Sequence, residues 1–266
     1  MKIALSLMNQ VWEDKPANRI LCDELAEKSL LHSVDLLIFP EMTLTGFTLA
    51  TKTIAEEIKS SESLGYFTDL AVSKKMGVVA GLVLKEDEIY RNCAVAFNRE
   101  GDQLACYAKV HLFSFSGEDR FVSGGSSLSV FEYDGLRFGL TICFDLRFPV
   151  LWHVLSETCD CIINIANWPS KRVDHWQVLL QARAIENQVF VVGVNRVGID
   201  GNQLEYEDSS IAFAPDGTRV DVQYIDRGLK IIEIEKKSLV RNQEEFPFRN
   251  DRKNFLYTKF LNDLQE

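Results

Sequence analysis

The sequence predicts an α/β protein in which helices cover two mixed β-sheets. Short apolar runs of strand propensity alternate with longer segments whose apolar residues recur every three or four positions, which is the helical period. Several pairs of strand-like runs are separated by only a few turn residues, which predicts antiparallel hairpins. Two mixed sheets with helices outside accommodate these hairpins better than one doubly wound parallel sheet does.

In the first third of the chain, strands and helices are predicted to alternate. The predicted strands cover residues 2–8, 35–40 and 77–84. A helix that begins at Pro16 and ends near Ser33 separates the first two strands, and a helix over 62–75 precedes the third. Proline is favoured in the first turn of a helix, and it stops a strand, as Pro40 is expected to do.

The rest of the chain adds hairpins to this alternation. The expected hairpin strands are 89–97 with 103–109, and 127–133 with 136–142. Further strands are predicted at 161–166 and 189–194, and helices from Pro149 to about Glu157 and over 173–188. The segment Ala214-Pro215-Asp216-Gly217 is expected to turn a last hairpin.

We interpret residues 1–266 as a single domain, because no repeat, low-complexity segment or linker interrupts the chain. Residues 244–266 are expected to form a C-terminal extension that packs on the body or on a partner subunit. Aromatic side chains in this extension would be unusual on a solvated tail. They are Phe246, Phe248, Phe255, Tyr257 and Phe260.

Composition and charge exclude several classes of function. The net charge is −10, whereas nucleic-acid binding needs a basic surface. No stretch approaches the ~20 apolar residues of a membrane helix, and the N-terminal apolar run is too short for a signal peptide. The six cysteines are scattered, unlike those of a secreted disulfide framework. We therefore expect a cytoplasmic protein with neither a nucleic acid nor a membrane as its partner.

Three charged residues lie where they could carry chemistry. Glu41 follows a proline at the end of a predicted buried strand, the edge at which open α/β folds bind ligands. Lys109 ends an apolar strand, and Glu118 lies in a polar loop. Taken singly, Glu41 and Glu118 have the alternative of being solvated surface charges. Lys109 has the alternative of lying at a sheet edge with its ammonium in water. His111, flanked by two apolar residues, is more typical of packing than of catalysis.

Cys143 is the strongest candidate nucleophile. It follows the predicted strand 136–142 and precedes a turn that leads into the helix at Pro149. Such a junction leaves backbone N–H groups free to bind an oxyanion. A nearby ammonium and the helix N-terminus are expected to lower the pKa of the Cys143 thiol. The alternative is a buried cysteine at a strand end.

No metal site or nucleotide-binding motif is predicted. Cys159 and Cys161 are separated by one residue, whereas zinc pairs typically have roughly two to four between them. The chain has no P-loop, no GxGxxG after a strand, no HExxH and no G-x-S-x-G elbow.

Together these segments resemble the nitrilase, or carbon–nitrogen hydrolase, superfamily. Residues 37–41 (LIFPE) resemble its glutamate motif, 107–113 (YAKVHLF) its lysine motif, and 140–149 (LTICFDLRFP) its nucleophile motif. The helix segment 183–188 (RAIENQ) is also similar to one that the family shares. The motifs occur in the family's order, and the resemblance extends from residue 2 to about 260.

The resemblance implies an αββα sandwich fold and an amidase that needs no cofactor. It implies that Cys143 attacks the amide carbonyl to give a thioester, that Glu41 is the general base, and that Lys109 stabilises the oxyanion. Glu118 corresponds to the family's second glutamate, which positions the substrate and supports the lysine. Subunits of the family pair, so a homodimer or higher homo-oligomer is expected.

Three later segments resemble the omega-amidase branch, which acts on 2-oxoglutaramate and related 2-oxo acid amides. They are 165–172, 175–177 and 193–202. Phe144 departs from the pattern, because a tyrosine is common there. A substrate carboxylate would need a local cation on this acidic protein, and Arg147 and Arg172 are the candidates, each alternatively a structural salt bridge. Trp168 is expected either to wall the pocket or to pack against the sheet.

Two other functions stay open from the sequence. One is another amidase of the superfamily, acting on deaminated glutathione or an N-carbamoyl compound. The other is a catalytically silent ligand-binding relative, which would normally lack one of Glu41, Lys109 and Cys143, all of which are present.

Overall fold

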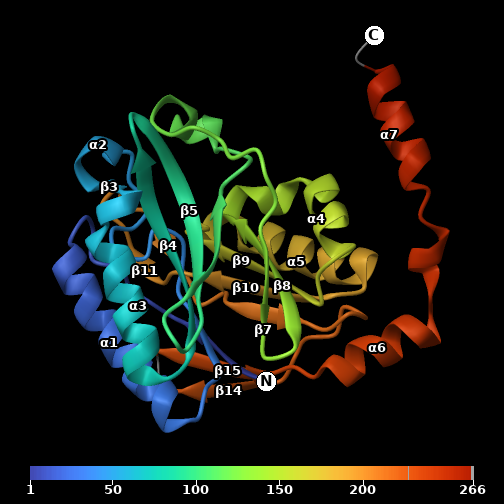
Figure 1. Cartoon of the computed structure of the whole chain (residues 1–266), viewed down its shortest axis with the longest axis horizontal. Helices are drawn as coiled ribbons and strands as arrows, with labels where there is room; N and C mark the ends of the chain where they lie inside the picture. Colours follow the sequence, from blue (N-terminus) through green and yellow to red (C-terminus); the bar gives the residue numbers. More distant parts are fainter. Residues whose placement is uncertain (227, 265–266) are drawn as a thin grey trace.

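The computed structural model describes residues 1–226 and 228–264, which form a four-layer sandwich of helix, sheet, sheet and helix (Figure 1). Two mixed β-sheets stack face to face around a shared apolar core, and helices cover the outer face of each sheet. The predicted α/β class and the αββα architecture are confirmed.

The first sheet has eight strands in the described part of the chain, in the order β14-β15-β1-β2-β4-β5-β6, with β3 beside β4. Its strands are β1 (Lys2–Ser6), β2 (Leu36–Ile38), β3 (Glu56–Glu57), β4 (Gly77–Glu86), β5 (Ile89–Phe97), β6 (Gln103–Ala108), β14 (Val222–Ile225) and β15 (Leu229–Glu233). The strands β1, β2 and β4 run parallel, whereas β4, β5 and β6 are antiparallel neighbours.

The second sheet has the order β13-β10-β9-β8-β7. Its strands are β7 (Val130–Tyr133), β8 (Leu136–Ile142), β9 (Cys161–Ala166), β10 (Phe190–Asn195) and β13 (Ile211–Phe213). The three central strands are parallel, and both edge strands are antiparallel. A small separate hairpin is formed by β11 (Gly198–Ile199) and β12 (Glu205–Tyr206).

Two long helices cover each sheet (Figure 1). They are α1 (Lys15–Leu31) and α3 (Glu62–Lys74) on the first sheet, and α4 (Pro149–Ser156) and α5 (Val173–Asn187) on the second. Local signals start them: Asp14 caps α1, Ser61 caps α3, and prolines stand in the first turns of α1 and α4. The short helix α2 (Thr51–Ile54) precedes β3.

One predicted hairpin forms only in part. The turn at 214–217 is present, with Ala214 N donating to Thr218 O at 2.8 Å, but only the single bridge between Phe213 and Arg219 follows it. The chain then crosses to the first sheet, where β14 pairs with β15 instead.

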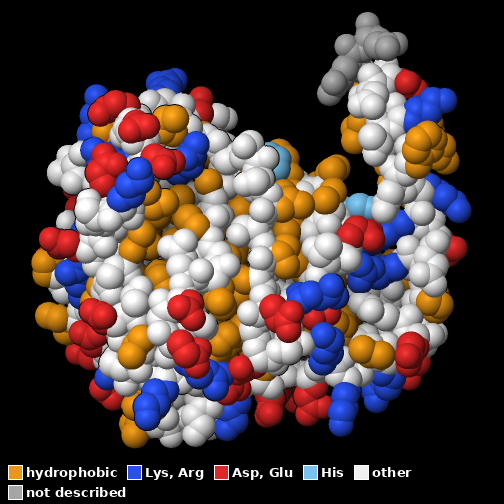
Figure 2. Space-filling view, viewed as in Figure 1, with side chains coloured by type: hydrophobic (Ala, Val, Ile, Leu, Met, Phe, Trp, Pro, Cys, Tyr) orange, Lys and Arg blue, Asp and Glu red, His pale blue; other side chains and the backbone are white. Residues whose placement is uncertain are grey.

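The C-terminal extension divides into two parts. Helix α6 (Lys236–Glu245) is followed by a segment that contacts the body, since Arg249 Nη2 donates to Ser156 O and Arg252 Nη1 donates to Glu157 Oε1 at 2.6 Å. Helix α7 (Asn254–Asp263) then projects away from the sandwich, with no buried residue and with hydrophobic side chains on its surface (Figures 1 and 2). Packing of α7 on a partner subunit stays a prediction, and residues 265–266 lie outside the described residues. No helix in the ranges described is long and apolar enough to cross a membrane.

Gly81, in the middle of β4, allows the segment after β2 to lie directly on that strand. A Cβ at this position would lie 2.4 Å from the Met42 backbone N and 2.7 Å from Glu41 Cα. Thr43 N donates to Gly81 O at 2.8 Å, and Gly81 N donates to Thr43 Oγ1 at 2.9 Å. The absence of a side chain on β4 therefore determines where Glu41 lies.

Replacing this glycine is expected to destabilise the fold. Gly81→Ala forces the 41–43 backbone to move, and overpacking of this kind costs about 1–3 kcal/mol. Gly65→Ala in α3 is the matched control, since nothing lies within 4 Å of the added Cβ and alanine stabilises a helix interior by roughly 0.5–1 kcal/mol over glycine. Thermal unfolding of both variants checks that Gly81→Ala has the lower Tm. Equal Tm values would show that the 41–43 segment can move without loss of stability.

Candidate active site

The four residues predicted to carry chemistry meet at one end of the stacked sheets. Glu41 follows β2, Lys109 follows β6, Cys143 follows β8, and Glu118 begins the short 3₁₀ turn Glu118–Arg120. The first sheet and its loops supply the three charged residues, and the second sheet supplies the cysteine.

Three buried charged side chains form the centre of the site. Lys109 Nζ donates to Glu41 Oε1 at 3.0 Å, and to Glu118 Oε1 and Oε2 at 3.1 and 2.9 Å. All three side chains have an exposed fraction of 0%. The alternatives of a solvated charge at Glu41 or Glu118, and of a lysine reaching into water, are therefore excluded.

Neutral donors complete the coordination of the two carboxylates. Asn92 Nδ2 donates to Glu41 Oε1 at 2.8 Å and to Glu118 Oε1 at 3.0 Å. The backbone N of Asn167 donates to Glu41 Oε2 at 2.9 Å, and that of Phe113 donates to Glu118 Oε2 at 2.6 Å. Carboxylates are tolerated in an apolar interior only with such partners, so these donors hold the cluster together.

The cluster keeps Lys109 charged. Burial alone would lower the pKa of the ammonium, but the attraction of Glu41 and Glu118 outweighs burial and raises the pKa above its ordinary value. An ammonium has three N–H donors; one can serve Glu41 Oε1, and a second can be shared by the two oxygens of Glu118, which leaves the third. Because Lys109 also lines the pocket, its remaining donor is available to a bound molecule.

Cys143 lies in a strained turn between β8 and α4. Its φ is +44°, in the left-handed region that non-glycine residues rarely adopt, and it begins the 3₁₀ segment Cys143–Arg147. The turn exposes part of the residue to the pocket and brings Sγ to 3.9 Å from the Asn167 carbonyl oxygen. The N–H of Phe144 stands in the first turn of this segment, where backbone donors lack an intrahelical acceptor.

The prediction that the pKa of the Cys143 thiol is lowered is wrong. Burial raises the pKa of Cys143 well above its ordinary value, the negative charge of Glu41 raises it further, and the Lys109 ammonium only partly opposes them. The helix N-terminus and the ammonium were expected to lower it, but the enclosing pocket and the adjacent carboxylate have the larger effect. The resting thiol is therefore protonated, and it needs a base to become a nucleophile.

Asp145 links the turn at Cys143 to the segment around Lys109 through hydrogen bonds. It is fully buried, and its carboxylate accepts from Tyr107 OH at 2.8 Å, from the backbone N of His111 at 2.9 Å and from the backbone N of Ile142 at 3.0 Å. His111 Nδ1 also lies 2.9 Å from Asp145 Oδ1, and its ring stacks on Phe148. His111 thus contributes to the packing of the site.

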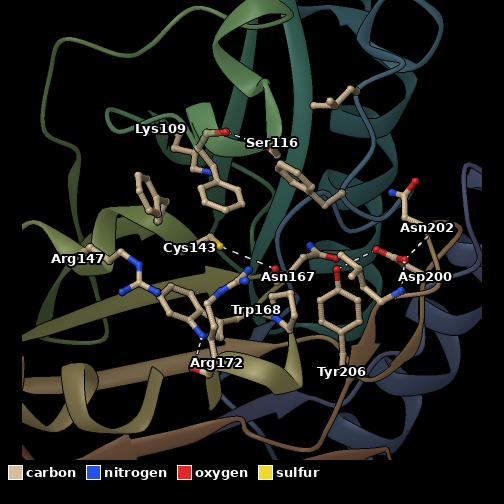
Figure 3. A pocket seen from close by; sticks show the side chains of 16 residues that line it. Lys109, Ser116, Cys143, Arg147, Asn167, Trp168, Arg172, Asp200, Asn202 and Tyr206 are labelled. Atoms are coloured by element: carbon tan, nitrogen blue, oxygen red, sulfur yellow. Dashed lines mark hydrogen bonds between the residues drawn. The ribbon is translucent and has the colours of Figure 1, made fainter. Parts of the chain in front are cut away.

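A cavity of about 340 Å³ opens above the cysteine (Figure 3). Its walls include five aromatic rings, those of Phe47, Phe113, Phe144, Trp168 and Tyr206. In Figure 3, Arg147 and Arg172 lie on one side of Cys143, and Asp200, Asn202 and Tyr206 lie on the other. An apolar cavity with a few polar groups is typical of a small-molecule site.

The four predicted substrate-binding residues, Phe144, Arg147, Trp168 and Arg172, all line this cavity. Trp168 both walls it and packs on the second sheet, and its Nε1 donates to Arg172 O at 2.7 Å. Neither arginine has a carboxylate within 4.0 Å among the described residues, so a structural salt bridge explains neither of them there. Each guanidinium instead lies over an aromatic ring, Arg147 over Trp168 at 4.7 Å and Arg172 over Phe113 at 5.8 Å.

Several site residues were not predicted from the sequence. Asn92 follows Arg91 in strand β5 with no motif to mark it, and Asn167 donates to Glu41 Oε2 through its backbone N–H, which no side-chain pattern reveals. The β11–β12 hairpin contributes Asp200 and Tyr206, whose side chains are hydrogen-bonded at 2.9 Å. No group of three or more His, Cys, Asp or Glu in residues 1–226 and 228–264 is arranged to hold a metal ion.

Comparison with known proteins identifies the family. The family model described as "Carbon-nitrogen hydrolase" matches residues 2–238, a span that contains every residue of this site. The chain belongs to the carbon–nitrogen hydrolase family. It is therefore a hydrolase of carbon–nitrogen bonds in amides, and the predicted family is confirmed.

Similar carbon–nitrogen hydrolases cover nearly the whole chain. The omega-amidase YafV of Escherichia coli is 32% identical over 96% of this chain and 98% of its own, and the 2-oxoglutaramate amidase of Bacillus subtilis is 31% identical over 91% and 94%. A carbon–nitrogen hydrolase superfamily protein from Xanthomonas campestris, solved with an arsenic adduct in its active site, superposes with a TM-score of 0.88. It is 30% identical and covers 95% of this chain and 97% of its own.

The raised pKa of the thiol predicts how Cys143 reacts when its base is removed. In Glu41→Gln, the rate of alkylation by iodoacetamide should keep rising with pH through about pH 9, because burial, the larger cause of the shift, remains. Mass spectrometry of the Cys143 peptide separates this reaction from that of Cys106, which is also partly exposed. A rate that levels off below about pH 8 would mean a low-pKa thiolate and would contradict the assignment.

Proposed function

We propose that the chain is a cysteine-dependent amidase that hydrolyses a small omega-amide bearing a carboxylate at its far end, with 2-oxoglutaramate as the model substrate. The observation that carries the proposal is a single cavity holding Cys143 between a carboxylate–ammonium cluster and two arginines without carboxylate partners in the described chain. The names of the relatives, omega-amidase and 2-oxoglutaramate amidase, support the same substrate class.

The first half of the reaction forms a thioester. Glu41 takes the proton of the Cys143 thiol, and the sulfur attacks the amide carbonyl carbon. The carbonyl oxygen becomes an oxyanion, which accepts hydrogen bonds from the third N–H of Lys109 and from the backbone N–H of Phe144. The proton then passes from Glu41 to the amide nitrogen, the C–N bond breaks, and ammonia leaves.

The second half hydrolyses the thioester. Glu41, now ionised again, takes a proton from water, and the hydroxide adds to the acyl carbon. The same donors stabilise the second oxyanion, the C–S bond breaks, and the thiolate recovers the proton from Glu41. Glu118 supports this cycle by holding Lys109 on the side away from the pocket, so that one ammonium donor keeps facing the substrate.

The paired arginines supply the recognition of the far carboxylate. Burial lowers the pKa of the Arg147 guanidinium, and the neighbouring Arg172 charge lowers it further, so the two cations are close enough to repel each other. Arg147 Nη2 also lies 3.3 Å from His175 Nδ1. An anionic ligand relieves this repulsion, and guanidinium groups bind carboxylates in a bidentate geometry.

Substitution of the three central residues tests the chemistry. Cys143→Ala should abolish ammonia release from 2-oxoglutaramate while the protein stays folded, because little volume is lost. Glu41→Gln should be nearly inactive, and Lys109→Met should lose ~10²–10³ in kcat, the usual cost of one oxyanion donor. Thermal unfolding accompanies each assay, because removing one partner of a buried ion pair also destabilises the fold. Substantial hydrolysis by Cys143→Ala would refute the mechanism.

Arginine substitutions test the substrate class. Arg172→Ala should raise KM for 2-oxoglutaramate about 30-fold or more, the equivalent of at least ~2 kcal/mol for a buried charge pair, and should change KM for a neutral aliphatic amide little. Arg147→Ala is measured in parallel, and Arg241→Ala, an exposed residue of α6, is the control. An equal effect on both substrates would make Arg172 structural. Hydrolysis of an N-carbamoyl compound or a neutral amide by the wild type, without activity on 2-oxoglutaramate or succinamate, would reassign the substrate.

A further inference from the structure

Asn92 connects the two carboxylates of the site. It lies on β5, where its side chain is 1% exposed, and its Nδ2 donates to Glu41 Oε1 at 2.8 Å and to Glu118 Oε1 at 3.0 Å. Its backbone O accepts from Lys109 N at 2.9 Å, so the same residue also fixes the strand end that carries the lysine. Lys109 and Asn92 therefore bridge the same pair of carboxylate oxygens.

The hydrogen bonds of Glu41 are unequal on its two oxygens. Oε1 accepts from Lys109 Nζ and from Asn92 Nδ2, which occupies both of its lone pairs. Oε2 accepts from the Asn167 backbone N, and one lone pair is left. The carbonyl oxygen of Asn167 lies 3.9 Å from Cys143 Sγ, so the carboxylate oxygen with the vacant lone pair and the thiol contact the same residue.

The orientation of the Asn92 amide follows from chemistry. Turned by 180°, its carbonyl oxygen would face two carboxylate oxygens and offer no proton to either. In the observed orientation Oδ1 is buried and has no hydrogen-bond partner in the described part of the chain. A leucine would leave no such buried oxygen unsatisfied, so packing alone gives no reason for an asparagine here.

We propose that Asn92 is a positioning residue that locks Oε1 of Glu41, so that only Oε2 accepts the proton of Cys143. The inference rests on the proposed role of Glu41 as the base. In the step concerned, the S–H bond of Cys143 breaks and an O–H bond forms at Oε2, while Oε1 keeps its two donors. Without Asn92, Oε1 regains a lone pair, and the carboxylate can turn that oxygen toward the thiol or hold a water there.

Asn92→Leu removes both donors and keeps the number and branching of the side-chain heavy atoms. A base misplaced by about 1 Å costs about 10²-fold in rate, so kcat for 2-oxoglutaramate should fall by roughly that factor while KM stays within about twofold. Alkylation of Cys143 by iodoacetamide at neutral pH should slow about tenfold, as it should in Glu41→Gln, where the loss of the proton acceptor is expected to outweigh the lower pKa of the thiol. The alkylation assay needs no amide, so it stays informative even where the proposed substrate is wrong.

Asn92→Asp is the isosteric partner of this variant. The introduced carboxyl would face Glu41 and Glu118, the Lys109 ammonium at the end of β6 and the Cys143 thiol beyond β8, and like charges raise the pKa of such a carboxyl. When it is protonated it can donate one hydrogen bond. Its activity relative to wild type should therefore recover as pH falls from about 8 to about 6, whereas the relative activity of Asn92→Leu should not change.

The outcomes separate this proposal from the proposed function. If Glu41→Gln alkylates as fast as wild type, the role of Glu41 as base is wrong. If Glu41→Gln is slowed but Asn92→Leu is not, or if both Asn92 variants show the same pH-independent loss, Asn92 is only structural. Asn92→Ala, which removes both donors and adds no volume, is carried in parallel in case Asn92→Leu does not fold. An activity of Asn92→Ala equal to wild type would likewise overturn the proposal.

Discussion

The site depends on enclosing two acidic side chains around one ammonium, out of contact with water. Such a cluster is costly to bury, and it persists only where further donors hydrogen-bond the carboxylates. Asn92, the backbone of Asn167 and the backbone of Phe113 are those donors. Because they come from a strand of the first sheet, the end of a strand of the second and a loop between the sheets, the cluster fixes the relative position of all three. The geometry around the cysteine is a consequence of satisfying these charges.

The same charges set the resting state of the Cys143 thiol. It lies near carboxylates in an enclosed pocket, which favours its protonated form, so the proposed mechanism needs a base to form the thiolate. The proposal divides the positive charges between two roles. Lys109 is held by two carboxylates and would bind the oxyanion, while Arg147 and Arg172, which lie over aromatic rings, would bind the substrate carboxylate.

The layers of the fold and the main site residues were predictable from the sequence, because strand and helix periods are local and Glu41, Lys109 and Cys143 stand in recognisable motifs. The features that could not be predicted depend on distances between residues, which a sequence does not contain. The sign of the thiol pKa shift depends on how close Glu41 comes, and the burial of Glu118 depends on a polar loop closing over Lys109. Asn92 gives no signal, since a single amide next to Arg91 in a strand belongs to no motif and has no spacing to mark it. The incomplete hairpin after Ala214 reflects competition, because β14 finds a longer partner in β15.

The division of the site between two sheets has a consequence for how the protein is made. Glu41, Asn92, Lys109 and Glu118 all belong to the first 118 residues, and their contacts lie within the first sheet and its loops. Cys143 and Asn167 arrive on the second sheet, later in synthesis, and the link from Asn167 to Glu41 spans 126 positions. In the proposed mechanism, the thiol therefore meets its base only when the two sheets dock. Until then a nascent or partly folded chain carries a cysteine without that base, so amide hydrolysis would begin only when folding is complete.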